Sequence, residues 1–172
     1  MYFVDVETTG LTSPYTLLEL GIVEVDSDLE VIDYQNFVFH YDLDPDELDP
    51  VIVAMHGNNG LLEKVRKSSL SPSMVVDYFN VFLSRNDQGK YPMCGSSVHF
   101  DRTVLKECLP EVEAWFHYRN IDVSSVKELV KLWYPEATFE DMPEPKKLHR
   151  AVPDCYDTIK ELKYYKENFF RG

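Results

Sequence analysis

The first third of the chain contains short runs of apolar residues interrupted by polar ones, a pattern that predicts strands. Residues 2–7, 17–26 and 30–40 are each rich in aromatic and β-branched residues, and turn-forming residues separate them. Because the links between the runs are short, we expect an antiparallel meander rather than strands joined by crossover helices. Glu19 lies inside the second run, where we interpret it as a charge at a strand edge.

The rest of the chain predicts helices that alternate with two further short strands. Apolar residues recur with helical spacing over 72–84, where Pro72 suits the first turn and Ser71 is a candidate cap. The other expected elements are a short helix with loops over 41–60, a turn over 86–89, a strand over 91–94, helices over 99–108 and 110–116, a strand over 118–123, a helix over 125–133 capped by Ser124, a loop over 134–147, and a helix over 153–169 with Pro153 near its start. This order predicts an α/β fold, a mixed sheet flanked by helices, in one domain over residues 1–172.

Charge narrows the classes of partner. Thirty acidic residues against 17 basic ones give a net charge of -13. Non-specific nucleic-acid binding depends on Lys and Arg side chains that meet phosphates, so this balance argues against long duplex nucleic acid as a partner. It does not exclude a short nucleotide substrate, because metal ions in a carboxylate pocket can supply the missing positive charge.

Composition and cysteine usage predict a reduced, cytoplasmic protein. The chain is 44% hydrophobic and 27% charged, as is usual for soluble globular proteins. No apolar run approaches the length of a membrane span, and a strand begins at once at the N-terminus, so we expect neither a membrane partner nor a signal peptide. Cys94, Cys108 and Cys155 are an odd number without metal-type spacing, which favours buried thiols over disulfides.

The first predicted strand carries the first sign of chemistry. Asp5 and Glu7 stand two residues apart, and the period of a strand places both side chains on one face, near its C-terminal end. Two like charges in an apolar strand are unfavourable unless they are compensated, and a divalent cation with oxygen ligands would compensate them. The alternative is an exposed edge strand with two solvated acids.

Three further candidates lie far away along the chain. His149 and Asp154 stand five residues apart at the start of the last predicted helix, after a long loop. Asp154 could enter a metal site, while His149 could take a proton from water near neutral pH. Asp101 lies in the first turn of a predicted helix, where an acid is also favoured by the helix dipole alone.

Taken together, these residues form three motifs in the order and spacing of a known family. The motifs are Asp5-x-Glu7-Thr8-Thr9-Gly10, Gly95-Ser96-Ser97-x-x-x-Asp101-Arg102 and His149-x-Ala151-x-x-Asp154. They resemble the motifs of the DEDDh 3′-to-5′ exonucleases. The resemblance extends almost end to end to the oligoribonuclease group, for example through Phe116-His117-Tyr118-Arg119-x-x-Asp122-Val123-Ser124. It implies a ribonuclease-H-like fold, with a mixed five-stranded sheet flanked by helices.

The resemblance also implies a phosphodiester hydrolase with a two-metal mechanism. The implied catalytic set is Asp5, Glu7, Asp101, Asp154 and His149. Two Mg²⁺ or Mn²⁺ ions are implied, with Asp5 bridging them, Glu7 and Asp154 holding one, and Asp101 acting mostly through water. His149 is implied as the group that takes the proton from the attacking water.

The implied substrates are short oligoribonucleotides, down to dinucleotides, which would be hydrolysed to nucleoside 5′-monophosphates. By the resemblance, Ser97, Arg119 and Ser124 hold the substrate's 5′-phosphate. Leu11 wedges between two bases, and Tyr118 stacks on a base from a second subunit of a homodimer. The residues alone leave other interpretations open, since Leu11 and Tyr118 suit a core and Ser124 suits a helix cap.

The chain departs from the family pattern at two positions. Val51 stands where the family usually has a tryptophan at the base site, which puts dinucleotide selectivity in question. Pro153 precedes the last acid, where family members carry a polar residue, and we expect it only to stiffen the helix start. Two alternative functions are an exonuclease for single-stranded DNA 3′ ends and a binding module that keeps the fold without the chemistry.

Overall fold

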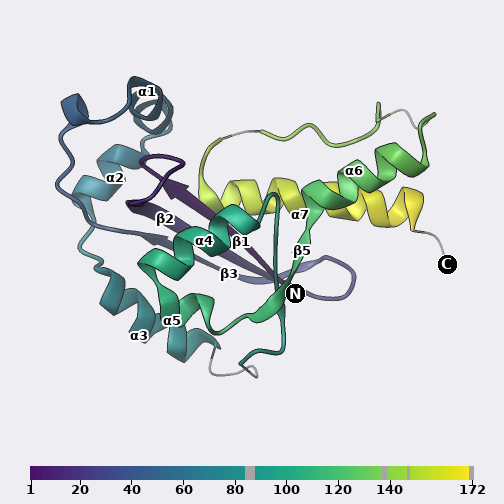
Figure 1. Ribbon diagram of the computed structural model, residues 1–172, viewed down its shortest axis with the longest axis horizontal. Coiled ribbons are helices and arrows are strands. Elements are labelled where there is room, and N and C mark those ends of the chain that lie inside the picture. The colour runs from purple at the N-terminus through teal and green to yellow at the C-terminus, as the bar shows by residue number, and fades with distance from the viewer. Residues whose placement is uncertain (84–87, 137–138, 147, 171–172) are drawn as a thin grey trace.

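The computed structural model describes residues 1–83, 88–136, 139–146 and 148–170, and its centre is a mixed five-stranded sheet (Figure 1). The strands are β1 (Tyr2–Thr8), β2 (Leu17–Val25), β3 (Val31–Val38), β4 (Pro92–Gly95) and β5 (His117–Asp122). Their order across the sheet is β3-β2-β1-β4-β5. The first three strands are antiparallel neighbours, whereas β4 pairs in parallel with both β1 and β5. The expected meander and the α/β class are therefore confirmed.

Helices cover both faces of the sheet. They are α1 (Pro50–Asn58), α2 (Leu61–Lys67), α3 (Pro72–Leu83), α4 (His99–Cys108), α5 (Pro110–Glu113), α6 (Val123–Trp133) and α7 (Ala151–Phe169), with a short 3-10 turn η1 (Pro45–Glu47). The alternation along β1 decides which face each side chain meets. Tyr2, Val4 and Val6 join the core under α3, α4 and α5, whereas Phe3 joins the core under α6 and α7.

A glycine allows α7 to reach the centre of the sheet. Gly21 lies on β2 directly opposite Asp5 on β1. A Cβ atom at Gly21 would lie 2.7 Å from the carbonyl carbon of Ala151 and 2.7 Å from the nitrogen of Val152. Only glycine leaves room for this approach, so the first turn of α7 packs beside Asp5 and brings Asp154 toward the same place.

Several expectations about single elements were wrong in detail. Asp122, not Ser124, caps α6, because the Asp122 carboxylate accepts a hydrogen bond from the Ser124 nitrogen and the helix begins at Val123. Helix α7 begins at Ala151, two residues before Pro153. Helix α2 was not expected, and α5 ends at Glu113 rather than at residue 116.

Other expectations are confirmed or fall outside the described part of the chain. The Met74 nitrogen donates to Ser71 Oγ at 3.4 Å at the start of α3, which agrees with the expected cap. Position 84 of that helix, positions 86–87 of the turn, and positions 137–138 and 147 of the predicted loop lie outside the described residues. Cys94, Cys108 and Cys155 are free thiols. Among the described residues, no helix has the length and apolar character that a membrane crossing requires.

Candidate active site

Three carboxylates meet at the C-terminal half of β1. Asp5, Glu7 and Asp154 each offer one oxygen, and these three atoms all lie within 4.8 Å of one another. The period of β1 places Asp5 and Glu7 on the face covered by α7, as the sequence predicted, and the first turn of α7 supplies Asp154. The arrangement offers oxygen ligands from two elements that are far apart in the sequence.

Asp101 approaches the same strand from another side. It lies in the first turn of α4, is only 4% exposed, and its Oδ1 accepts a hydrogen bond of 2.9 Å from the Val6 nitrogen. Strand β4 pairs with β1 only at Tyr2 and Phe3, so the Val6 amide lies beyond that pairing and Asp101 satisfies it instead. Asp101 thus does more than complement a helix dipole, because it places a fourth carboxylate beside β1.

Burial and mutual repulsion make the protonated forms of these acids favourable. Burial is the largest cause in each case, and for Asp5 the charges of Asp101 and then Glu7 add to it, so its pKa lies well above the usual range. The pKa of Glu7 is raised to about 8 and that of Asp101 to about 7, while that of Asp154 is also raised. A divalent cation would remove this repulsion, and carboxylate oxygens are the ligands that Mg²⁺ and Mn²⁺ prefer. The donor set therefore fits a divalent cation.

A fifth acid on the same face has a partner of opposite charge. Glu19 lies on β2 directly opposite Glu7 and is fully buried. Arg150 donates two hydrogen bonds to its carboxylate, at 2.8 Å from Nε and 2.6 Å from Nη2, and the Ala151 nitrogen donates a third at 3.1 Å. Burial would raise the pKa of Glu19, but Arg150 outweighs it and the pKa is lowered. The expectation of a charge at a strand edge was therefore wrong, because Arg150, 131 positions away, is the partner that allows burial.

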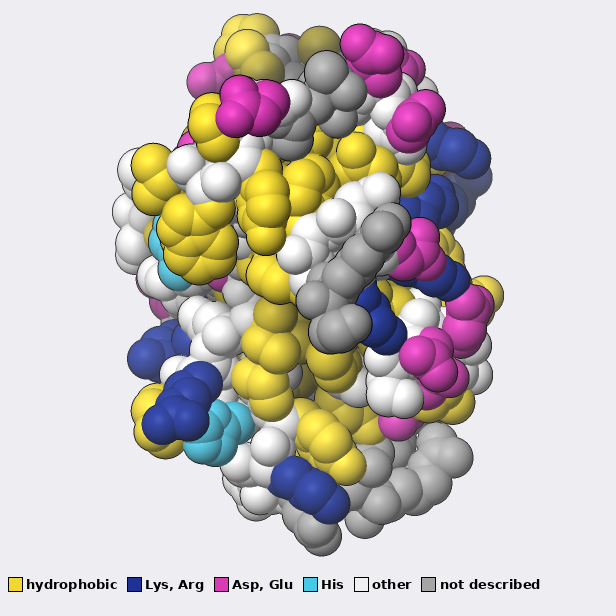
Figure 2. Space-filling view, turned by 90° about the vertical axis from the view of Figure 1, so that its right-hand side faces the viewer, with side chains coloured by type: hydrophobic (Ala, Val, Ile, Leu, Met, Phe, Trp, Pro, Cys, Tyr) yellow, Lys and Arg dark blue, Asp and Glu magenta, His cyan; other side chains and the backbone are white. Residues whose placement is uncertain are grey.

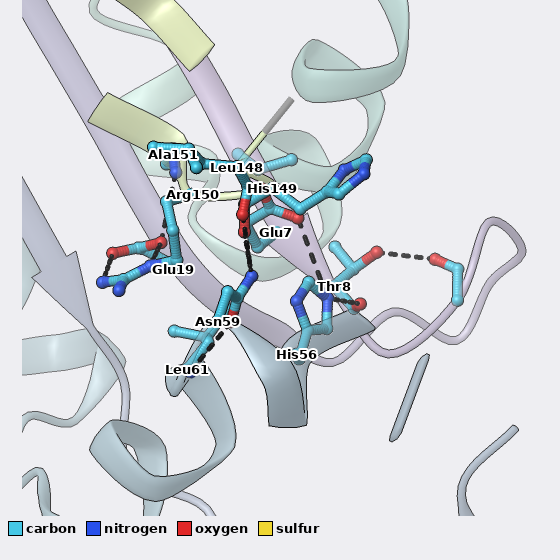
Figure 3. A network of polar contacts seen from close by, with 12 residues as sticks. Glu7, Thr8, Glu19, His56, Asn59, Leu61, Leu148, His149, Arg150 and Ala151 are labelled. Atoms are coloured by element: carbon cyan, nitrogen blue, oxygen red, sulfur yellow. Dashed lines mark hydrogen bonds and ion pairs between the residues drawn. The ribbon is translucent and has the colours of Figure 1, made fainter. Parts of the chain in front are cut away.

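His149 lies between the long loop and Arg150, the residue that pairs with Glu19. Its backbone has φ +50°, in the left-handed region, and its side chain is exposed. Figure 3 shows its imidazole directed away from the Glu19–Arg150 pair. With residues of α1 it lines a shallow depression of about 570 Å³. Val51, 70% exposed, lies in this depression, so the position that the family gives to tryptophan borders His149 in this chain.

A second histidine, which the sequence analysis did not single out, packs against the acid cluster. His56 of α1 is fully buried, and its Nε2 lies 3.3 Å from the Thr8 carbonyl oxygen and 3.7 Å from Glu7 Oε2. Burial lowers the pKa of His56, so the ring is neutral at pH 7 and its contact with Glu7 is not an ion pair. His56 instead holds α1 against the end of β1. The sequence of α1 has no distinct apolar face, so it gives no local sign that His56 is buried.

The structure brings together two of the three residues predicted to hold a phosphate. Ser97 has φ +54°, and its nitrogen donates to Asp122 Oδ1 at 2.9 Å. Its hydroxyl lies 3.4 Å from the Ser124 hydroxyl, which donates to the same Asp122 oxygen at 2.7 Å. Asp122, which was not singled out as a site residue, therefore organises both serines.

Arg119, Tyr118 and Leu11 lie at the surface. The Arg119 guanidinium carbon is 5.4 Å from the centre of the Tyr118 ring, and among the described residues no hydrogen bond joins this guanidinium to Ser97 or Ser124. Leu11 is 79% exposed and Tyr118 is 74% exposed, so the interpretation of these two as core residues was wrong. Both are available to a bound molecule.

The mixed sheet with its flanking helices is a fold shared with solved nuclease structures. Escherichia coli exonuclease I in complex with single-stranded DNA superposes on 99% of this chain with a TM-score of 0.73 and 21% identity, and the match spans 41% of that longer chain. The Mg²⁺- and Mn²⁺-bound form of Schizosaccharomyces pombe Pop2p gives a TM-score of 0.72 at 12% identity, over 98% of this chain and 83% of its own. At these identities the likeness establishes the fold.

Sequence similarity is more specific. The family model described as Exonuclease (RNase_T) matches residues 2–162, and the chain belongs to this family. Its relatives include the oligoribonuclease of Nitrosomonas europaea, 38% identical over 178 positions that cover 99% of this chain and 95% of that protein. The oligoribonuclease of Thiobacillus denitrificans is also 38% identical, over 100% of this chain and 96% of its own length.

Proposed function

We propose that the chain is a 3′-to-5′ exoribonuclease that hydrolyses short oligoribonucleotides, down to dinucleotides, to nucleoside 5′-monophosphates. The observation that carries the proposal is the convergence of Asp5, Glu7, Asp101 and Asp154 on the C-terminal half of β1. His149 directly precedes Arg150, which is bound to Glu19 on the same face. The full-length similarity to proteins named oligoribonuclease supports RNA as the substrate class. On this proposal residues 1–172 form a single exonuclease domain of a cytoplasmic enzyme.

Each acid has a proposed part in holding two Mg²⁺ or Mn²⁺ ions. Asp5, Glu7 and Asp154 would hold the ions through their carboxylate oxygens, with Asp5 shared between the two, and Asp101, held by the Val6 amide, would contribute mostly through water. When bound, such ions activate a water molecule and stabilise the charge that develops on the departing 3′-oxygen. A ring nitrogen of His149 would accept a proton from the attacking water, and the exposure of the residue leaves it accessible for this role.

The substrate's 5′ end is proposed to bind at the Ser97–Ser124 pair. Two hydroxyl groups and the Arg119 guanidinium supply donors to a terminal phosphate, and the guanidinium can bind it bidentately. The Arg119 guanidinium lies over the Tyr118 ring, so on this proposal its side chain turns toward the serines when phosphate binds. A site closed around the 5′-phosphate would favour short strands over long ones.

Two exposed apolar side chains are proposed to contact the bases, and one of them acts across a homodimer. Leu11 wedges between the two bases, and Tyr118 stacks on a base bound by a second subunit. A dimer is supported by apolar side chains on the face that includes the C-terminal ends of α6 and α7 (Figure 2). There Leu132 is 72% exposed and Trp133 is 59% exposed. Surface of this kind is typical of protein–protein contacts.

A length series with purified protein tests the proposal. The substrates are 5′-phosphorylated RNAs of two, five and ten nucleotides and a single-stranded DNA of matching length, each with Mg²⁺ and with Mn²⁺. We expect the dinucleotide to give the highest kcat/KM and mononucleotides as products. Equal rates at all lengths would count against the 5′-phosphate site, and no release of mononucleotide with either metal would favour a binding module.

The Arg119→Gln variant sharpens the same series. Hydrogen bonds to a charged group contribute about 1.5–3 kcal/mol, so we expect kcat/KM for the 5′-phosphorylated dinucleotide to fall roughly 10- to 150-fold. The same RNA with a 5′-hydroxyl is the matched control, and its rate should change little. A loss of equal size on both substrates would assign Arg119 a role other than phosphate binding.

The shared fold with exonuclease I favours one second candidate, an exonuclease acting on single-stranded DNA 3′ ends. The net charge of -13 argues against it, because long strands require many contacts between phosphates and basic residues. Faster hydrolysis of the DNA than of any RNA in the length series would replace the first proposal with this one.

A further inference from the structure

The side chain of Asn59 connects the α1–α2 junction with the segment that carries His149. Its amide nitrogen donates hydrogen bonds to two consecutive carbonyl oxygens, that of Leu148 at 3.1 Å and that of His149 at 2.6 Å. Its carbonyl oxygen accepts a hydrogen bond of 2.9 Å from the Leu61 nitrogen, in the first turn of α2. Figure 3 shows Asn59 pointing from the α1–α2 side toward the Leu148–His149 segment.

The backbone of His149 needs such support. Its φ of +50° lies in the left-handed region, which is unfavourable for a residue with a Cβ atom by about 1–2 kcal/mol. The residues that follow are fixed by the three hydrogen bonds to Glu19. Those three hydrogen bonds do not involve the carbonyl groups of Leu148 and His149, which accept hydrogen bonds from Asn59 instead. Asn59 therefore holds the backbone at Leu148 and His149, and Glu19 holds the two residues that follow.

Asn59 is also linked to the acid cluster, through helix α1. Asn59 closes α1, since its nitrogen donates to the Met55 carbonyl oxygen, and α1 is held on β1 by the contact of His56 with Thr8 and Glu7. The position of His149 relative to the carboxylates therefore depends on α1 as well as on α7. Asn59 itself does not belong to the three motifs that carry the family resemblance.

We infer that Asn59 is a positioning residue for His149. It acts through the backbone of His149, holding the left-handed conformation that directs the imidazole over α1 and toward the proposed water site. The inference rests on the proposed function, in which His149 takes the proton. Without the two amide hydrogen bonds, the carbonyl groups of Leu148 and His149 lose their side-chain donor, the left-handed backbone of His149 is less favoured, and the imidazole samples positions away from the reacting water.

The Asn59→Asp variant tests the inference with a minimal change. A carboxylate still accepts the hydrogen bond from the Leu61 nitrogen, so this contact at the start of α2 is kept, but it cannot donate to the two carbonyl groups and repels them. We expect kcat for a 5′-phosphorylated dinucleotide to fall roughly 10- to 100-fold, as for small displacements of a catalytic group, with KM nearly unchanged. Asn59→Ser, which keeps an acceptor and has one donor, should lose less.

A double-mutant cycle separates positioning from a structural role. His149→Ala alone should lower kcat by about 10²–10⁴-fold. If Asn59 acts through His149, adding Asn59→Asp to His149→Ala changes kcat by less than about twofold, because the group it positions is gone. A further loss of the full size in that background would overturn the inference. Mn²⁺ binding, measured by calorimetry, should be retained in every variant, since Asp5, Glu7 and Asp154 are unchanged.

Asp49→Ala is the matched control for damage to α1. Asp49 caps the other end of α1 by accepting a hydrogen bond of 2.8 Å from the Val51 nitrogen, and it does not touch the 148–149 segment. The control should lower the melting temperature without lowering kcat. If it lowers kcat as much as Asn59→Asp, the inference is wrong. Full activity of His149→Ala would instead refute the proposed role of His149, whereas an inactive His149→Ala beside a fully active Asn59→Asp would refute the inference alone.

Discussion

Glu7 and Glu19 face each other across β1 and β2, on the same face of the sheet, yet their environments differ in one respect. Glu19 binds the guanidinium of Arg150, and its pKa is lowered. Glu7 forms no ion pair with Lys or Arg among the described residues. Burial, followed by the charges of Asp154 and Glu19, raises its pKa to about 8, and the charge of Arg150 offsets this only in part. Two buried acids at adjacent positions thus differ in compensation, since Arg150 neutralises Glu19 directly and leaves Glu7 for a bound cation.

This difference separates a structural acid from a candidate ligand. Paired with Arg150, Glu19 fixes the start of α7 and so positions Asp154, without offering a free oxygen pair to a metal. Glu7, Asp5 and Asp154 keep their repulsion in the metal-free protein. A buried group left uncompensated by its own chain marks a functional site more reliably than burial or charge alone.

The largest effect is expected from removing one of the proposed metal ligands. Asp5→Asn replaces the carboxylate that is proposed to bridge two cations, so we expect hydrolysis of a dinucleotide to fall by at least about 10³-fold. The metal-free variant should melt at a higher temperature than the wild type, because a neutral amide replaces a buried acid that folding either leaves with an unfavourable charge or forces to bind a proton. Kinetics with Mn²⁺ and thermal melting in EDTA check both parts. Full activity of the purified variant would reject the metal-ligand role.

Removing Arg150, the partner of Glu19, should lower the stability of the metal-free protein. Arg150→Met leaves the fully buried Glu19 without its partner, and removal of one member of a buried pair costs about 3–5 kcal/mol. Urea denaturation of the metal-free protein measures this loss. The Glu19→Gln/Arg150→Met double variant is the control, and it should recover much of the stability. If Arg150→Met is as stable as the wild type, Glu19 is not held by Arg150 in solution.

The sequence could predict those features of the two acids that depend on residues close to them in the chain. The period of a strand placed Asp5 and Glu7 on one face, and short links predicted the antiparallel meander correctly. The same local logic failed for Glu19, because its partner Arg150 is 131 positions away and nothing near Glu19 announces it. Asp101 and Asp154 were placed by resemblance to a family, since no periodicity links them to β1.

The errors in the helices have a similar cause. Helix α2 begins after Gly60 in a left-handed conformation, without a side-chain cap of the usual kind, so its start carries no familiar signal. At α6 the choice between Asp122 and Ser124 as cap depends on the end of β5, where Asp122 also holds Ser97. Contacts between distant segments decide such details, and a linear pattern does not contain them.

The smallest expected effect is a pH dependence that only the uncompensated acids should produce. The folded-state pKa of Glu7, about 8, lies above the ordinary value of 4.5 for a glutamate, so between these pH values the folded protein binds more protons than the unfolded chain. The stabilisation is fully present below the unfolded pKa and is lost as the pH rises toward 8. Asp5 and Asp101 shift in the same direction and add to the loss.

We therefore expect the melting temperature in EDTA to fall by several degrees between pH 5 and pH 8, since 1 kcal/mol corresponds to about 2–4 °C for a domain of this size. Saturating Mn²⁺ should remove most of the fall, because the cation favours the ionised carboxylates. Glu7→Gln should make the fall in EDTA smaller, with the remainder due to Asp5 and Asp101, whereas Arg119→Gln, which removes no acid, should leave the profile unchanged. A wild-type profile that is flat in EDTA, or that Mn²⁺ does not alter, would mean that the acids of β1 are compensated within the chain after all, and the contrast between Glu7 and Glu19 would be lost.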